Sequence, residues 1–395
     1  MQFDPMNAPS DFPLIALQPV FDARHAWVAL RLTSERPFES SGMRRLIEDC
    51  AVAGLLGEIP CIVPADPLRI DPALADGLPR HRLILLFPWE AGAEGANRAA
   101  LQALHEAGFG LMAAGVPEEN AVLAPAVTAL AVACPGSAAP EHLIRLLLER
   151  PGPHLALGTS EKVCPGFCRF HWLSGHYAGM ISPALQGDPS ARSQLLRLLA
   201  LVTADAELAE LEAVFKRDAG LSYKLLRLVN SVSYMPGRRI ENFSQALIIL
   251  GRRQLQRWVT LLLFARPAGN DSASPLLPQA ALRGSLLEAL ARHQGSTRDR
   301  RDLAFMTGMF SLLDQLFGQP LAEILAPLNL ADEVVQALLG RHGDFGAFLR
   351  TVELAEQDAF PALAGALGES GIDPESWAAM LIDAAHWATL VGKEA

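Results

Sequence analysis

The chain has 395 residues, a formal net charge of −10 and a hydrophobic content of 50%. This length favours two domains, and the hydrophobic content is sufficient for a sizeable core in each of them. The acidic balance argues against a dedicated nucleic-acid binder, because such proteins are usually basic overall.

The first residues, the apolar runs and the cysteines indicate the compartment in which the protein is expected. The first residues, up to Pro13, hold acids and prolines where a secretory signal needs a basic region and an apolar run. The continuous apolar runs are far shorter than the roughly 20 residues that span a bilayer. The five cysteines are odd in number and scattered, at Cys50, Cys61, Cys134, Cys164 and Cys168. We therefore expect a reduced, cytoplasmic protein without a membrane segment.

The first half of the chain alternates strand-like and helix-like segments. The predicted strands are residues 14–20, 27–32, 59–63, 83–87, 109–113, 127–133 and 154–157. The predicted helices are residues 43–54, 97–107 and 141–150. Strands that alternate with helices predict a mostly parallel sheet, either open or closed into a barrel.

A stretch rich in Pro, Gly and Ser, residues 182–190, ends this alternation. Almost everything after it is predicted to be helical, with helices over 278–293, 300–317, 320–325, 331–339, 345–357 and 374–391. We therefore expect an α/β domain over residues 1–185 and an all-helical domain over residues 190–395.

Between residues 215 and 251, two short apolar helices flank a polar turn. The residues that carry a family likeness are Asp218, Leu221, Leu225, Leu228, Val229, Asn230, Ser231, Ala246, Leu250 and Gly251. In type and spacing they resemble the signature of the HDOD domain, an all-helical relative of the HD-type phosphohydrolases that lacks their metal ligands. The resemblance implies a structural role for Asp218, Leu221, Leu225, Asn230, Ser231 and Gly251, and a part in bacterial signal transduction for the protein.

The metal-binding pair of the HD enzymes is also absent from the sequence. Where those enzymes carry Gly-Leu-Leu-His-Asp, this chain has Gly308 to Leu312, with Ser311 and Leu312 in place of the His-Asp pair. The surrounding residues, 305–314, resemble a bacterial two-domain family in which an EAL domain precedes an HDOD domain. The resemblance implies that the helical domain holds no metal.

The residues from Gln18 to Asp22, QPVFD, resemble the opening of the EAL domain, a (β/α)-barrel family that hydrolyses cyclic di-GMP. The family carries a metal-binding glutamate on the following strand, and Arg31 stands at that position here. A metal-dependent phosphodiesterase needs several carboxylates at its strand ends, because they hold the cations that activate water. An arginine instead places a positive charge where a cation should bind.

Other family ligand positions are changed as well. The strand that should offer asparagine has Cys61–Pro64, and the strand over 83–87 is followed by no carboxylate before Glu90. No charged residue occurs between Asn120 and Glu141, where the family has a lysine and an aspartate. The resemblance thus implies a degenerate EAL-like, TIM-type barrel, trimmed or distorted, with no metal, no cofactor and no hydrolysis.

The segment 216–257 is basic. It holds nine basic and two acidic residues, a balance of +7 within a chain of −10. The candidate docking face consists of Lys224, Arg227, Arg238, Arg239, Arg252, Arg253 and Arg257. Its partner would be acidic, either a protein or a nucleotide; the alternative is a solvated helix face or an internal interface. Nucleic acid is the least favoured partner, because no aromatic residues are interleaved as a stacking platform.

A second candidate ligand set consists of Cys164, Cys168, His171 and His176. These residue types suit zinc, but the spacing is unusual for a zinc site. The alternative is a turn followed by a barrel strand in which the four residues have no joint role.

Together these patterns favour a non-catalytic bacterial signalling protein that acts through protein contacts. The alternative is a sensor that binds cyclic di-GMP or another nucleotide at the barrel mouth, where Arg31 would meet a phosphate. An active hydrolase would need a carboxylate cluster that the sequence does not offer. The partner and the oligomeric state stay open.

Overall fold

The computed structural model describes residues 12–133 except 94 and 96, then 140–158, 170–175, short helical pieces within 196–204 and 255–264, and 276–394. These residues divide into two compact units. The barrel unit holds the described residues from 12 to 175, apart from 24–27, and also Leu354–Asp383. The helical unit holds 24–27, the described residues from 196 to 353, and the end of the chain from Ala384.

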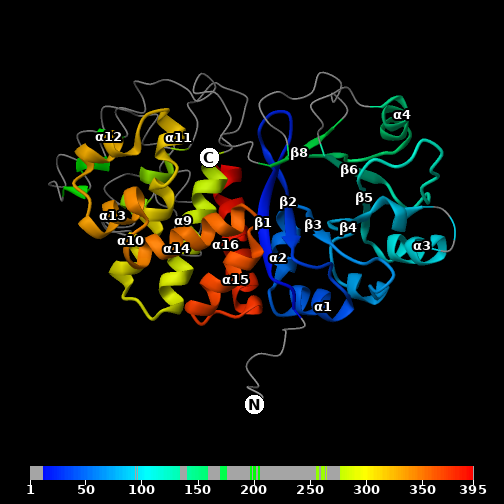
Figure 1. The fold of residues 1–395 in the computed structure, drawn as a ribbon, viewed down its shortest axis with the longest axis horizontal. Helices are drawn as coiled ribbons and strands as arrows, with labels where there is room; N and C mark the ends of the chain where they lie inside the picture. The colour runs from blue at the N-terminus through cyan, green and yellow to red at the C-terminus, as the bar shows by residue number, and fades with distance from the viewer. Residues whose placement is uncertain are drawn as a thin grey trace, which may run out of the picture. The chain divides into compact units, whose positions relative to one another are not determined.

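In the barrel unit, eight strands close into a barrel in chain order (Figure 1). They are β1 (Ile15–Phe21), β2 (Trp27–Ser34), β3 (Cys61–Pro64), β4 (Leu83–Pro88), β5 (Gly110–Ala114), β6 (Ala129–Ala133), β7 (Leu155–Leu157) and β8 (Trp172–Ser174). Neighbouring strands from β2 to β8 run parallel, whereas β1 pairs antiparallel with β8. The prediction of a mostly parallel sheet is confirmed, and it is closed.

The connections of the barrel are mostly helical. They are α1 (Ser40–Glu48), α2 (Val52–Glu58), the 3-10 turns η2 (Pro72–Ala75) and η3 (Trp89–Gly92), α3 (Arg98–Ala107) and α4 (Glu141–Glu149). The single helix predicted over 43–54 is wrong, because α1 and α2 are separate. Ala51 takes a left-handed conformation with φ of 51°, so the chain changes direction before α2 begins.

The interior of the barrel is mostly apolar. Buried side chains from β1 to β7 form one cluster there, including Val20, Ala29, Ile62, Ile84 and Met112. Side chains alternate between the two faces of a strand, so every second residue faces this interior. Gln18 and Arg31 are in step with Val20 and Ala29 respectively, and they therefore lie on the inner face as well.

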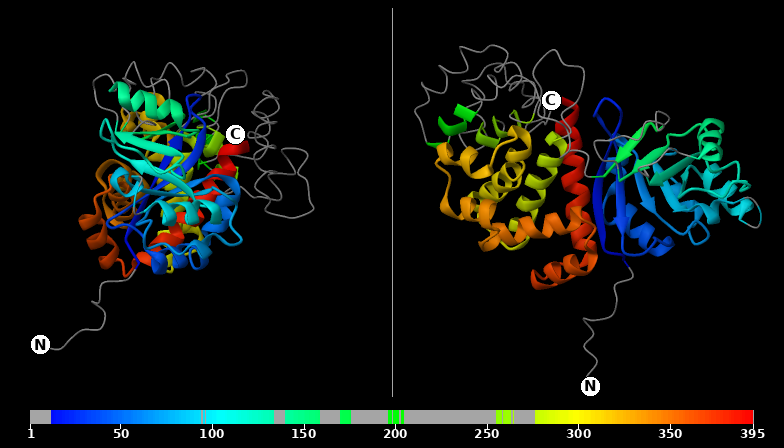
Figure 2. Two further views of the ribbon diagram at one scale, coloured as in Figure 1. Left: turned by 90° about the vertical axis from the view of Figure 1, so that its right-hand side faces the viewer. Right: turned by 45° about the horizontal axis from the view of Figure 1, so that its top comes forward.

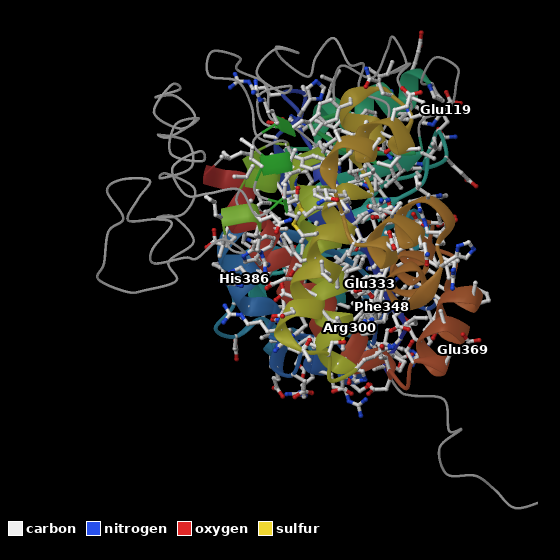
Figure 3. All side chains as sticks on the ribbon, turned by 90° about the vertical axis from the view of Figure 1, so that its left-hand side faces the viewer. Glu119, Arg300, Glu333, Phe348, Glu369 and His386 are labelled. Carbon is white, nitrogen blue, oxygen red and sulfur yellow. The ribbon has the colours of Figure 1, made fainter. Side chains whose placement is uncertain are left out.

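The helical unit is built around α9 (Leu276–His293) and α10 (Arg298–Phe310). They are followed by α11 (Leu313–Phe317), α12 (Leu321–Leu325), the 3-10 turn η6 (Ala326–Leu328), α13 (Asp332–Gly340) and α14 (Gly343–Glu356). Arg300 on α10 lies 3.0 Å from both Glu333 and Asp344, so it links three helices (Figure 3). The helix predicted over 300–317 is broken after Phe310, where the Ser311 hydroxyl donates to the Gly308 carbonyl at 2.7 Å. Such side-chain bonds compete with the helical backbone pattern.

The C-terminal part of the chain completes the barrel unit. Helix α15 (Phe360–Glu369) and the first half of α16 (Pro374–Glu394) belong to it, so the unit does not end near residue 185 as predicted. The buried Trp377 donates from Nε1 to the Ile15 carbonyl at 2.9 Å, and Figures 1 and 2 show α16 beside β1. Among the helices that the structure describes, none is long and apolar enough to cross a membrane.

Two glycines allow α9 and α10 to pack closely. A Cβ added to Gly308 would lie 2.6 Å from the Arg283 carbonyl oxygen and 2.7 Å from the Gly284 nitrogen. A Cβ added to Gly284 would lie 2.9 Å from the Phe305 ring. Because the first clash is with backbone, it can be relieved only by moving one helix away from the other.

Replacing Gly308 with alanine should therefore destabilise the helical unit by about 1–3 kcal/mol, the usual cost of overpacking a core. Chemical unfolding followed by circular dichroism measures this change. The matched control is Gly365→Ala on the exposed side of α15, where an added Cβ meets nothing within 4 Å. That change should be neutral or slightly stabilising. Equal stability of the two variants would contradict the packing account.

Candidate functional site

Arg31 on β2 is a charged side chain inside the barrel. Its side chain is 15% exposed, and Nη2 lies 3.8 Å from the Asp358 carboxylate. The same Nη2 donates to Gln18 Oε1 at 2.9 Å. Burial lowers the pKa of the Arg31 guanidinium, and the Asp358 charge opposes that shift. The guanidinium still carries its proton at neutral pH, because arginine does not lose it in proteins.

Asp358 supplies the counter-charge from the C-terminal part of the chain. It lies in the short link between α14 and α15 and has a φ of 54°. Its carboxylate accepts hydrogen bonds from Gln18 Nε2 at 2.8 Å and from the Thr33 hydroxyl. We call Gln18, Arg31, Thr33 and Asp358 the barrel-mouth cluster, since Thr33 precedes the end of β2, where the parallel strands open.

The surroundings of this cluster do not fit a divalent metal. Arg31 stands beside Ile62 in the β2–β3 register, and Ile62 stands beside Ile84 in the next pair. Glu90, the carboxylate that follows β4, is exposed in η3. Among the described residues, no group of three or more His, Cys, Asp or Glu side chains could hold a metal ion. The oxygen ligands that such a cation needs are therefore not assembled in this part of the chain.

Ser311 and Leu312, which are predicted to replace the His-Asp pair, lie in the core of the helical unit. Ser311 is buried, its hydroxyl accepts from Arg283 Nη1 at 2.8 Å, and Leu312 is fully buried. A hydroxyl that is already engaged and an aliphatic side chain cannot replace a His-Asp metal pair. These residues, as at the barrel mouth, do not fit a metal.

The candidate docking face lies mostly outside the described residues, as does the whole HDOD signature from Asp218 to Gly251. Arg257 is described, and it is only 8% exposed. Its guanidinium lies 2.9 Å from Glu288 and 3.6 Å from the centre of the Phe305 ring. Arg257 therefore contributes to the interior of the helical unit and not to an exposed docking face.

The proposed zinc set is also only partly described. Cys164, Cys168 and His176 lie outside the described residues, so a shared metal remains an untested alternative. His171 Nδ1 accepts a hydrogen bond from the backbone N–H of His154 at 3.4 Å, and strand β8 follows it.

His154 itself is fully buried. Its Nδ1 accepts from the Leu130 N–H at 3.2 Å, and its Nε2 lies 2.9 Å from the Leu147 carbonyl. This pattern requires a neutral ring, and burial lowers the pKa of His154 accordingly. His171, a member of the proposed zinc set, and the neighbouring His154 thus both make hydrogen bonds to the backbone.

Comparison with known proteins supports one part of the sequence-based interpretation directly. A family model for the HDOD domain matches residues 189–323. The chain contains an HDOD domain. The chain is 32% identical to the cyclic di-GMP phosphodiesterase CdgJ of Vibrio cholerae over 183 residues, an alignment that covers 46% of this chain and 42% of CdgJ. It is 35% identical over 145 residues to the uncharacterized protein YuxH of Bacillus subtilis, covering 36% of this chain and 35% of YuxH.

The chain thus spans only 35% of the length of YuxH and 42% of the length of CdgJ. Among solved structures, it is similar to the EAL domain of Mycobacterium smegmatis DcpA. The two share 15% identity over 41% of this chain and 90% of that domain, with a TM-score of 0.29. A score this low does not decide the ancestry of the barrel.

Removing the Asp358 carboxylate should leave the buried Arg31 guanidinium without its counter-charge and so lower the free energy of unfolding. We expect Asp358→Ala to destabilise the barrel unit by about 1–3 kcal/mol, the range for a lost hydrogen bond to a charged group. In an Arg31→Met background the same change should cost clearly less, because no buried charge is left unpaired. Denaturant unfolding of the four proteins of this double-mutant cycle gives the coupling.

The control for this cycle is Glu48→Ala, which removes a carboxylate from the exposed Arg44–Glu48 pair on α1. Exposed pairs contribute about 0–1 kcal/mol, so this variant should remain close to the wild type. If Asp358→Ala costs the same with and without Arg31, the two side chains are not coupled and the account of the cluster fails.

Proposed function

We propose that this HDOD protein is a non-catalytic signal-transduction protein of bacterial cyclic di-GMP-related signalling. In this proposal both phosphodiesterase-like scaffolds have lost their chemistry, and the signal passes through contacts with other proteins. The free cysteines Cys50 and Cys61, both buried, are compatible with a cytoplasmic location.

The barrel-mouth cluster carries the proposal. A hydrolase of this class would use the barrel mouth to hold cations and an activated water. Here the mouth holds the Arg31 guanidinium, which lies 3.8 Å from the Asp358 carboxylate. A guanidinium has donors only, so it can neither bind a metal nor accept a proton from water. The one carboxylate of the cluster, Asp358, is already engaged by Gln18 and Thr33 and lies beside Arg31. In this proposal the cluster is therefore suited to binding an anion and not to generating a nucleophile.

The relatives support the signalling context. CdgJ is described as a cyclic di-GMP phosphodiesterase, and the region of similarity covers less than half of either chain. A shared scaffold does not imply a shared reaction, because function resides in site residues. We infer that this protein kept the scaffold and lost the hydrolytic residues.

The contact surface that we propose is the basic segment of the HDOD domain. Its members are Lys224, Arg227, Arg238, Arg239, Arg252 and Arg253, without the buried Arg257. Six positive charges within one segment of an acidic chain would favour a partner with an acidic surface.

We expect the purified protein to give no linear product from cyclic di-GMP in the presence of Mg²⁺ or Mn²⁺. The reason is that, among the described residues, the barrel-mouth cluster holds only the Asp358 carboxylate, which is already engaged by Gln18 and Thr33, and the Ser311 position holds none. Chromatography of the reaction over several hours measures it, with an active phosphodiesterase as the positive control. Turnover that is lost in an Arg31→Met variant would show that the mouth is catalytic after all.

Reversing Arg238 and Arg239 to glutamate should release the protein partners that the wild-type chain retains in an affinity pull-down from its native cells. Opposite charges steer association, so like charges should reduce it strongly. The charge-matched control reverses Arg44 and Arg145, two exposed arginines of the barrel unit. Identical partner sets for all three proteins would contradict the proposed contact surface.

A further inference from the structure

The Arg31 guanidinium retains hydrogen-bonding capacity that its neighbours do not use. Its Nε is buried and has no hydrogen-bond partner among the residues that the structure describes. Leaving a buried donor unpaired costs about 1–3 kcal/mol, so each such group calls for an explanation. An arginine presents its N–H groups as a planar fork whose geometry matches carboxylate and phosphate oxygens.

Two further donor side chains, Gln18 and Thr33, contact the carboxylate of Asp358. Gln18 Nε2 and the Thr33 hydroxyl donate to the two different carboxylate oxygens of Asp358. The Gln18 carbonyl oxygen is held by Arg31 Nη2 at 2.9 Å and by the Ser174 hydroxyl at 3.5 Å, which directs the amide nitrogen toward Asp358. Three donor side chains and one positive charge therefore face a single carboxylate.

We propose that Gln18, Arg31 and Thr33 form a binding site for a phosphate group, and that Asp358 is an internal competitor occupying this site. The carboxylate of Asp358 offers two oxygens in one plane, and both are engaged. A phosphate is tetrahedral and has more oxygens, and in this proposal one of them accepts from Arg31 Nε, which is otherwise unpartnered in the described part of the chain. This inference goes beyond the proposed function and does not depend on a protein partner.

The position of Asp358 allows such a competition. Its side chain is 32% exposed, whereas that of Arg31 is 15% exposed, so the Asp358 carboxylate is the more accessible of the two to solvent. The link that carries it is short, and its left-handed φ of 54° is uncommon outside glycine. Displacing Asp358 would release this conformation while the phosphate takes over the bonds to Gln18 and Thr33.

The test is titration calorimetry of the full-length chain in a buffer without phosphate. The probes are inorganic phosphate, cyclic di-GMP and acetate, which separate a free phosphate, a nucleotide phosphate and a planar carboxylate. Asp358→Asn removes the competing charge and keeps the shape and the left-handed conformation, which asparagine tolerates. This variant should bind one of the two phosphate probes about tenfold more tightly than the wild type does, and acetate less tightly than that probe. Arg31→Met should abolish binding.

The control is Glu375→Gln, which removes a carboxylate from the same C-terminal segment, where Glu375 pairs with Arg45 at 3.3 Å. It should bind phosphate as the wild type does. Tightening equal to that of Asp358→Asn would mean that only the overall charge matters, and would overturn the proposal. So would a folded Asp358→Asn protein that binds neither phosphate probe more tightly than the wild type does.

Hydrogen exchange on the wild-type chain provides a measurement that requires no variant. Saturation with the phosphate probe that binds should speed amide exchange at residues 357–360, because Asp358 leaves the mouth. Exchange that is unchanged or slower in this segment would show that the anion does not displace Asp358, and the competition would be refuted.

Discussion

Arg31 lies inside a β-barrel, where a positive charge is stable only beside an anion or a set of acceptors. The anion comes from Asp358, whose carboxylate also accepts from Gln18, 340 positions earlier in the chain. This arrangement ties the start of the barrel to the link before α15. Together with the Trp377–Ile15 hydrogen bond, it holds the C-terminal segment in the barrel unit, and without Asp358 the guanidinium would be buried and unbalanced.

Replacing a carboxylate ligand with an arginine would change whether a barrel mouth can activate water, but not whether it can attract a phosphate. A bound divalent cation and a guanidinium both attract phosphate oxygens. Only the cation is a Lewis acid that can lower the pKa of a bound water. A site converted in this manner retains affinity for anions and loses the means to hydrolyse them. The predicted replacement of a His-Asp pair in the helical unit would have a different result, because Ser311 and Leu312 are buried within the core, where Arg283 donates to Ser311.

Much of the fold follows from local sequence patterns, and the exceptions have physical causes. Apolar runs such as Leu83–Phe87 identify strands well, because both faces of a barrel strand are buried. Strand β8 spans only Trp172–Ser174, too short for a pattern. Helix α15 contains Pro361, Gly365 and Gly368, which obscure a helical signal. The left-handed Ala51 that divides α1 from α2 gives no signal either, because alanine is a good helix former.

Only some residues of the barrel-mouth cluster could be predicted from the sequence. Arg31 stands out because the family likeness predicts a glutamate at its position, so the sequence alone points to this residue. Asp358 has no such marker. It lies just after a predicted helix, and its contacts with Gln18 and Thr33 are long-range, so they leave no periodicity in the local sequence. The same holds for Arg283, whose bond to Ser311 joins two helices.

The connectivity of the chain links the barrel-mouth cluster directly to helix α14. Helix α14 is anchored in the helical unit, where Glu353 pairs with Arg341 at 2.7 Å. It ends at Glu356, and Asp358 follows two positions later. A change in the position or the end of α14 therefore acts on Asp358 through a link of very few bonds, and the charge balance of Arg31 depends on that residue. An anion that displaces Asp358 would act on the same link from the opposite end. If a ligand that binds at α14 shifts Asp358 in this way, reciprocity requires that anion binding at the barrel mouth changes the affinity for that ligand by the same factor.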